Sequence, residues 1–84
     1  MMGQFTIEGQ FLRSVYIRVD KEPHKVADAG HALAVLTTHL KQDTERRLAA
    51  VEACRKVLRG ELYAPIARRL FVSAALEARV LIGD

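Results

Sequence analysis

The 84 residues include 13 lysines and arginines against 10 aspartates and glutamates, giving a net charge of +3, and half of all residues are hydrophobic. This length suffices for one hydrophobic core and leaves no room for a second domain, while the balance of apolar and charged residues excludes a disordered or fibrous chain. The basic excess is small and interleaved with acidic residues, which argues against a dedicated nucleic-acid-binding stripe.

Cysteine usage and the start of the chain predict the cellular compartment. The single cysteine, Cys54, cannot form an intramolecular disulfide, and Met1 to Gln4 lack the basic and apolar regions that begin a signal peptide. The apolar runs are far shorter than the roughly 20 residues needed to cross a bilayer. We therefore expect a cytoplasmic protein without a membrane-spanning segment.

The first part of the chain, residues 1–27, reads as a strand region. Ser14 to Val19 alternates apolar and polar side chains, which predicts a half-buried strand. Phe5 to Glu8 alternates more weakly, and the sequence leaves open whether residues 4–8 form a strand. A turn is expected over Asp20 to Pro23, because Asp initiates turns and Pro lacks a donor for a central strand. A short strand, His24 to Ala27, should follow.

Two helices are predicted next, over residues 28–41 and 44–59. Asp28 is placed as the N-cap of the first, and Asp43 or Thr44 caps the second, which ends at Gly60 in a left-handed conformation. Apolar residues at helical spacing predict one buried face on each helix: Ala29, Ala32, Leu33, Leu36 and Leu40 on the first, and Ala50, Val51, Cys54, Val57 and Leu58 on the second.

A third helix is expected within residues 64–78, with Pro65 as its first fully helical residue. Val80 to Ile82 can then add a short edge strand. The predicted fold is a small single α+β domain: two or three N-terminal strands, three helices, and a possible C-terminal strand, with the apolar face of the strands packed on the helices. The core face of the third helix comprises Ile66, Ala67, Leu70, Phe71, Ala74 and Ala78.

The three helical segments share residues with a known family. The matching positions are Ala32-Leu33 with Leu36, then Ala50, Cys54, Leu58 and Gly60, then Ala67-Arg68, Phe71-Val72, Ala74-Ala75 and Glu77-Ala78. On these residues the chain resembles, over about residues 24–79, the short bacterial proteins grouped as domain of unknown function 982. It departs from that pattern at Arg47, where Tyr is common, at Arg79, where Gly is common, and in lacking a Trp near residues 39–41. The resemblance implies the order of the elements and carries no activity.

The sequence holds no clear catalytic or metal-binding motif. His31 and His39 are eight residues apart, about 12 Å along a helix, so one ion cannot bind both. A site of His24 and His31 would need Asp28 to converge with them, which the sequence permits without favouring it. Cys54 lies on the apolar side of its helix, which predicts a buried, unreactive thiol. We predict no catalytic residues, no metal and no cofactor.

Basic residues on the second and third helices allow a nucleic-acid-binding alternative, in which Arg46, Arg55, Lys56 and Arg59, with Arg68 and Arg69, contact phosphates. Interspersed glutamates and the few aromatic residues weaken it, and solvated surface charge accounts for the same residues. Arg47 falls over the apolar side of this helix, where it either extends past the core edge or meets an acidic partner.

The third helix suggests an interaction function, because apolar residues extend beyond its core face. Val72, Ala75 and Leu76 are expected on the outer side, with Arg68, Arg69 and Arg79 around them. We interpret these six residues as the interaction surface of a small regulatory protein, which a homodimer or a protein partner would cover.

Overall fold

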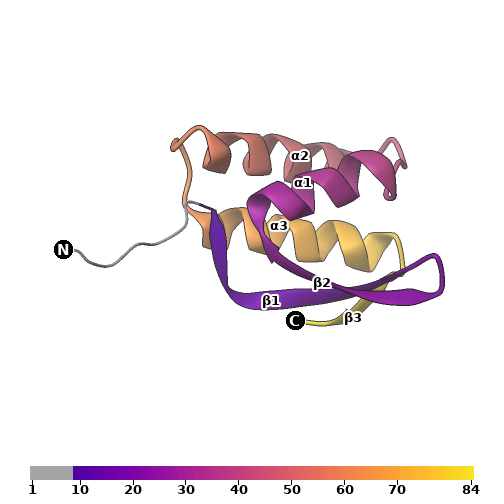
Figure 1. Cartoon of the computed structure of the whole chain (residues 1–84). Helices are drawn as coiled ribbons and strands as arrows, with labels where there is room; N and C mark the ends of the chain where they lie inside the picture. Colours follow the sequence, from indigo (N-terminus) through magenta and orange to yellow (C-terminus); the bar gives the residue numbers. More distant parts are fainter. Residues whose placement is uncertain (1–8) are drawn as a thin grey trace.

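The computed structural model describes residues 9–84 (Figure 1). The elements follow in this order: β1 (Gln10–Val19), β2 (Glu22–Asp28), α1 (Ala29–Thr38), α2 (Glu45–Leu58), α3 (Ala64–Glu77) and β3 (Leu81–Gly83). The expected α+β domain is confirmed, including the short C-terminal strand. The weaker strand predicted at Phe5 to Glu8 lies outside the described residues.

The strands form one antiparallel sheet in the order β2-β1-β3. The hairpin turn is shorter than predicted, because Glu22 and Pro23 already belong to β2. Asp20 and Lys21 make the turn, with φ angles of 55° and 68°, the left-handed conformation that both central residues of a type I′ turn require. Pro23 is tolerated because β2 is an edge strand.

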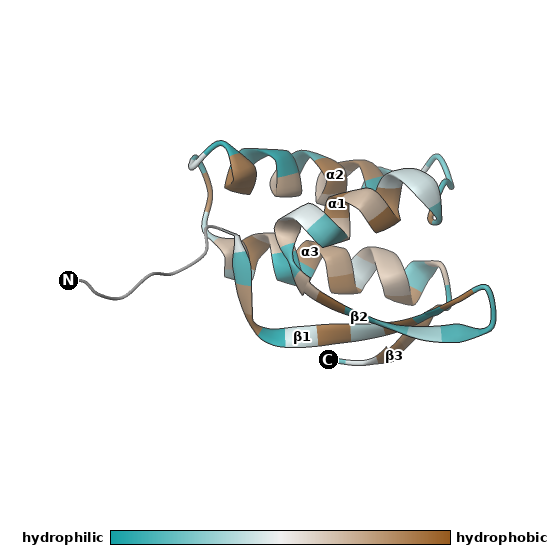
Figure 2. Cartoon of the chain, in the orientation of Figure 1, coloured by the Kyte–Doolittle hydropathy of each residue, from teal (hydrophilic) through white to brown (hydrophobic). Residues whose placement is uncertain are grey.

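All three helices lie on one side of the sheet (Figure 1). α1 packs on β2 and α3 on β1, while α2 packs on both of these helices and lies farther from the sheet. The predicted inward face of β1 is confirmed, since Val15, Ile17 and Val19 are buried. Figure 2 shows hydrophobic residues in β1 and in the helices that cover it, and hydrophilic residues at the turn between β1 and β2.

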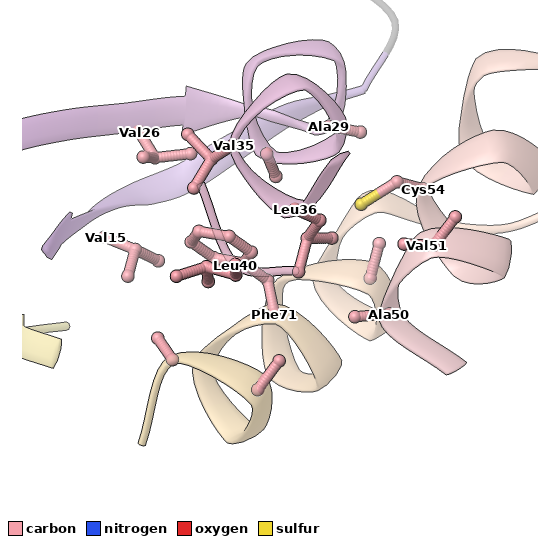
Figure 3. Close-up of a cluster of buried hydrophobic side chains, with 14 of the residues drawn as sticks. Val15, Val26, Ala29, Val35, Leu36, Leu40, Ala50, Val51, Cys54 and Phe71 are labelled. Carbon is pink, nitrogen blue, oxygen red and sulfur yellow. The ribbon is translucent and has the colours of Figure 1, made fainter. Parts of the chain in front are cut away.

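A single core joins the sheet to the helices. Phe71 is the largest fully buried side chain, and Figure 3 shows its ring pointing from α3 into the cluster that contains Val15, Leu36 and Leu40. Two predicted core residues are instead exposed, Leu58 by 45% and Ile66 by 37%. Other residues, among them Val35 and Ala53, are buried although they were not predicted to belong to the core. Each helix contacts more than one neighbouring element, and therefore buries a wider arc of its surface than a single apolar face.

The predicted helix ends agree with the structure to within one residue, except at the end of α1. The Asp28 carboxylate accepts a hydrogen bond from the His31 amide at 2.7 Å, and Thr44 rather than Asp43 caps α2. α1 ends at Thr38, three residues early, because the Leu40 amide donates to Val35 O instead of continuing the helix. Pro65 is the second residue of α3, not the first.

Schellman motifs terminate α2 and α3. After α2, the Gly60 amide donates to Val57 O and the Glu61 amide to Lys56 O, and Gly60 has the left-handed φ of 76° that was predicted. After α3, Arg79 holds the equivalent place with a φ of 63°, where glycine is the favoured residue. The departure from the family pattern at Arg79 therefore falls on a strained backbone position.

Candidate interaction surface

The outer side of α3 is partly apolar and open to solvent. Leu76 is 57% exposed and Val72, one turn before it, is half-buried. Arg69 and Pro65 on the same side are exposed. The sequence placed Ala75 there too, and this is wrong: Ala75 has no exposed surface, because it lies one turn after Phe71 on the arc of the helix that faces the core.

A groove opens between this side of α3 and the start of β1. Its volume is about 290 Å³, and its lining residues are Leu12, Arg13, Pro65, Arg68, Arg69, Val72 and Asp84. Figure 1 shows the first part of β1 leaving the plane of the sheet toward the helices, and the pairing of β1 with β2 shifts register between Gln10 and Val15. This bend brings β1 against the first half of α3.

Leu12 is the most exposed large hydrophobic residue of the described chain, at 92%. Its neighbour Phe11 is buried, whereas Leu12 and Arg13 are both exposed, so the alternation expected of a strand is interrupted at the bend and resumes at Val15. Leu12, Arg13, Pro65 and Asp84 were not predicted as surface residues of this site. Leu12 and Arg13 were missed because the strand was expected to begin at Ser14. The available signal was the pair Phe11-Leu12, which carries two large apolar residues toward opposite faces.

Arg68 forms hydrogen bonds to the two segments that line the groove beside α3, the start of β1 and Asp84. Its Nε donates to Arg13 O at 2.8 Å, and its Nη2 donates to the backbone oxygen of Asp84. Arg13 and Arg69 are exposed, and no side-chain carboxylate of residues 9–84 forms a salt bridge with any of the three arginines. Arg79 lies beyond the far end of α3 and does not line the groove.

One known family matches most of this fold, although Leu12 and Asp84 of the groove lie outside the matched residues. The model of a family described as "Protein of unknown function (DUF982)" matches residues 13–82, from the middle of β1 to β3. The chain belongs to the DUF982 family. The match extends the resemblance seen in the sequence, residues 24–79, at both ends and thereby includes the sheet. No curated protein and no solved structure matches the chain.

The basic residues of α2 in this DUF982 chain do not form one stripe. Arg46 lies in the first turn, with Nη1 3.4 Å from Ser73 Oγ, while Arg55, Lys56 and Arg59 follow roughly 13 Å farther along the helix. Arg59 pairs with Glu61 at 3.2 Å and with Glu52 at 3.8 Å, and the hydrogen bond that it donates to the Glu61 carboxylate raises the pKa of Arg59. The nucleic-acid-binding alternative stays a prediction that this pairing does not favour.

Arg47 takes neither of the two roles left open by the sequence. Its Nε donates to Leu36 O at 3.0 Å and to Leu40 O, so the guanidinium binds carbonyls at the C-terminal end of α1. The Leu36 carbonyl has no partner within its helix, since the Leu40 amide donates to Val35 O. α1 carries no basic residue in its last turn, and Arg47 supplies that charge from the neighbouring helix.

The histidines do not form the cluster of His24, His31 and Asp28 that the sequence permitted. The rings of His24 and His39 lie 6.4 Å apart, and His39 Nδ1 is 3.9 Å from a carboxylate oxygen of Asp20. Asp28 is occupied as the cap of α1 and does not join His24 to His31 in a cluster. Within residues 9–84, no three His, Cys, Asp or Glu residues are placed to hold a metal ion. Nor is any helix in this range long and apolar enough to cross a membrane.

The predicted burial of Cys54 is confirmed, since its side chain has no exposed surface. Burial removes the thiolate from water and raises the pKa of the thiol from 9.0 to about 11. The unfolded chain releases this proton at lower pH than the folded chain does. The contribution of Cys54 to stability is therefore complete below pH 9 and is lost as the pH rises toward about 11.

We expect Cys54 to react with a thiol reagent at pH 8 at least about a hundredfold more slowly in the native protein than in urea, because reaction requires opening of the core. Absorbance of the released leaving group measures this directly, since the chain has one cysteine. Labelling of the native protein at nearly the unfolded rate would contradict a buried, protonated thiol.

Proposed function

We propose that this DUF982 chain is a small protein-binding domain that contacts its partner through the outer side of α3 and the start of β1. The observation that carries the proposal is the exposure of Leu12 (92%) and Leu76 (57%) on either side of Val72. Single exposed leucines are ordinary on soluble proteins. Here Leu12 and Val72 line the same groove and Leu76 lies one turn beyond Val72, so the three side chains follow one side of α3.

Covering these three side chains would also supplement a small core. A chain of this length buries only roughly 60% of the surface that its unfolded form exposes. Its stability is therefore low, on the order of several kcal/mol. Each leucine buried against a partner adds about 1.5–3 kcal/mol relative to an exposed one. The homodimer expected from the sequence is one way to cover the three side chains, and a different protein partner is the other.

A charge-neutral double variant, Leu12→Ser/Leu76→Ser, tests the binding surface. We expect it to remain folded, because both side chains are substantially exposed, and to lose association. The matched control is Leu48→Ser/Leu58→Ser, which removes two leucines of α2 that are 50% and 45% exposed. Sedimentation velocity over a concentration series measures self-association, and crosslinking in the producing cell followed by mass spectrometry measures other partners.

The expected result is a protein complex, of either kind, that the α3 variant abolishes and the α2 control retains. Circular dichroism melting curves establish that both variants are folded. A wild-type chain that stays monomeric at high micromolar concentration, and forms no crosslinked product sensitive to Leu12 and Leu76, would remove the basis for this function.

A further inference from the structure

The chemistry of the groove between β1 and α3 is both apolar and positive. Leu12, Pro65 and Val72 supply apolar surface, and three arginines surround it against one acidic residue, Asp84. None of the three guanidinium groups forms a salt bridge with a side-chain carboxylate within residues 9–84. An occupant that matches this surface carries carboxylates next to an apolar side chain.

The groove is small and open, and therefore suits one side chain of a bound peptide better than a fully enclosed small molecule. Its volume of about 290 Å³ is at the lower limit of ligand pockets, which enclose roughly 300–1,000 Å³. The open shape accommodates one side chain of a longer segment. Arg68 is held by the backbone oxygens of Arg13 and Asp84, so the side chains of Arg13 and Arg69 are the cations that remain for an incoming carboxylate.

A second copy of the chain fits this groove poorly. A two-fold dimer brings the same patch of both subunits together, and therefore gathers the three arginines of each copy at one interface with only the two copies of Asp84 to balance them. Like charges brought together at an interface repel one another and weaken association. An acidic partner removes this repulsion and pairs the arginines instead.

We propose that the groove binds an acidic segment of a partner protein, with one apolar side chain between Leu12, Pro65 and Val72 and flanking carboxylates on Arg13 and Arg69. The inference rests on the proposed function and names the partner's chemistry. Arg68 is a positioning residue, because its hydrogen bonds hold β1 and Asp84 at the edges of the groove.

The test is a titration of the full-length chain, labelled with ¹⁵N, with the pentapeptide Glu-Glu-Leu-Glu-Glu. We expect chemical-shift changes at the amides of Leu12, Arg69 and Val72, and binding that weakens as salt rises. Arg13→Gln and Arg69→Gln should each raise the dissociation constant about fivefold, as loss of an exposed ion pair at the upper end of the measured range does. Arg55→Gln, which changes an exposed arginine of α2, is the matched control and should leave it unchanged.

Two further peptides separate charge from apolar contact. Lys-Lys-Leu-Lys-Lys should not bind, and Glu-Glu-Ser-Glu-Glu should bind at least about tenfold more weakly, because it lacks the side chain that enters the groove. Equal binding of the serine peptide, indifference to Arg13→Gln and Arg69→Gln, or no binding of the leucine peptide would overturn the proposal. So would a two-fold dimer that buries the groove, although that dimer would support the protein-binding function itself.

Discussion

Replacing Phe71 with alanine is expected to lower the free energy of unfolding by about 3–5 kcal/mol. The ring has no exposed surface and points into the cluster where the sheet meets α1 and α3, so its loss removes buried apolar area and leaves a cavity. Stabilities of roughly 0.05–0.15 kcal/mol per residue are typical, so this loss is comparable with the whole stability of the domain. Urea denaturation monitored by circular dichroism measures the change.

The matched control for Phe71 is Tyr63→Ala, which also removes an aromatic ring but at a position that is 80% exposed. We expect it to change the free energy of unfolding by no more than about 0.5 kcal/mol. Phe71→Leu should lie between the two, because it refills most of the space. A Phe71→Ala protein as stable as Tyr63→Ala would mean that α3 does not pack against the sheet as the structure has it.

Replacing Arg47 with methionine should lower the free energy of unfolding by about 2 kcal/mol, because hydrogen bonds from charged groups to buried or half-buried partners contribute about that much. Methionine keeps the apolar stem on α2 and removes only the guanidinium, which binds Leu36 O and Leu40 O. At 4–8 °C per kcal/mol for a domain of this size, the melting temperature should fall by roughly 8–16 °C.

Arg46→Met serves as the control for Arg47, since Arg46 is its neighbour on α2, is exposed, and makes only one long hydrogen bond within residues 9–84, to Ser73. Its melting temperature should stay within a few degrees of the wild type. If the two variants melted alike, the contact of Arg47 with the end of α1 would contribute nothing to stability. Hydrogen exchange of the amides in the last turn of α1 gives a second, local measure, which should speed up only in Arg47→Met.

The sequence alone determined the features that depend on near neighbours in the chain. Alternation identified the inward face of β1, Asp28 identified the start of α1, and Gly60 identified the end of α2. A cap, a left-handed glycine and a strand period are each fixed by a few consecutive residues, and their chemistry is therefore readable without the fold. The resemblance to DUF982 came from the same local patterns.

Only the tertiary structure determined which residues are buried and which residues distant in sequence contact one another. Ala75 is buried and Leu58 is exposed because the arc that a helix buries depends on how many elements pack around it. Arg47 is 11 residues from Leu36 in sequence, and it binds the end of α1 only because α2 packs against that helix. The groove requires the bend of β1 to bring Leu12 and Arg13 beside α3, more than 50 residues away, where Arg68 bonds to Arg13 O. No periodicity of a single segment encodes such a contact, since it arises only when separate elements are packed together.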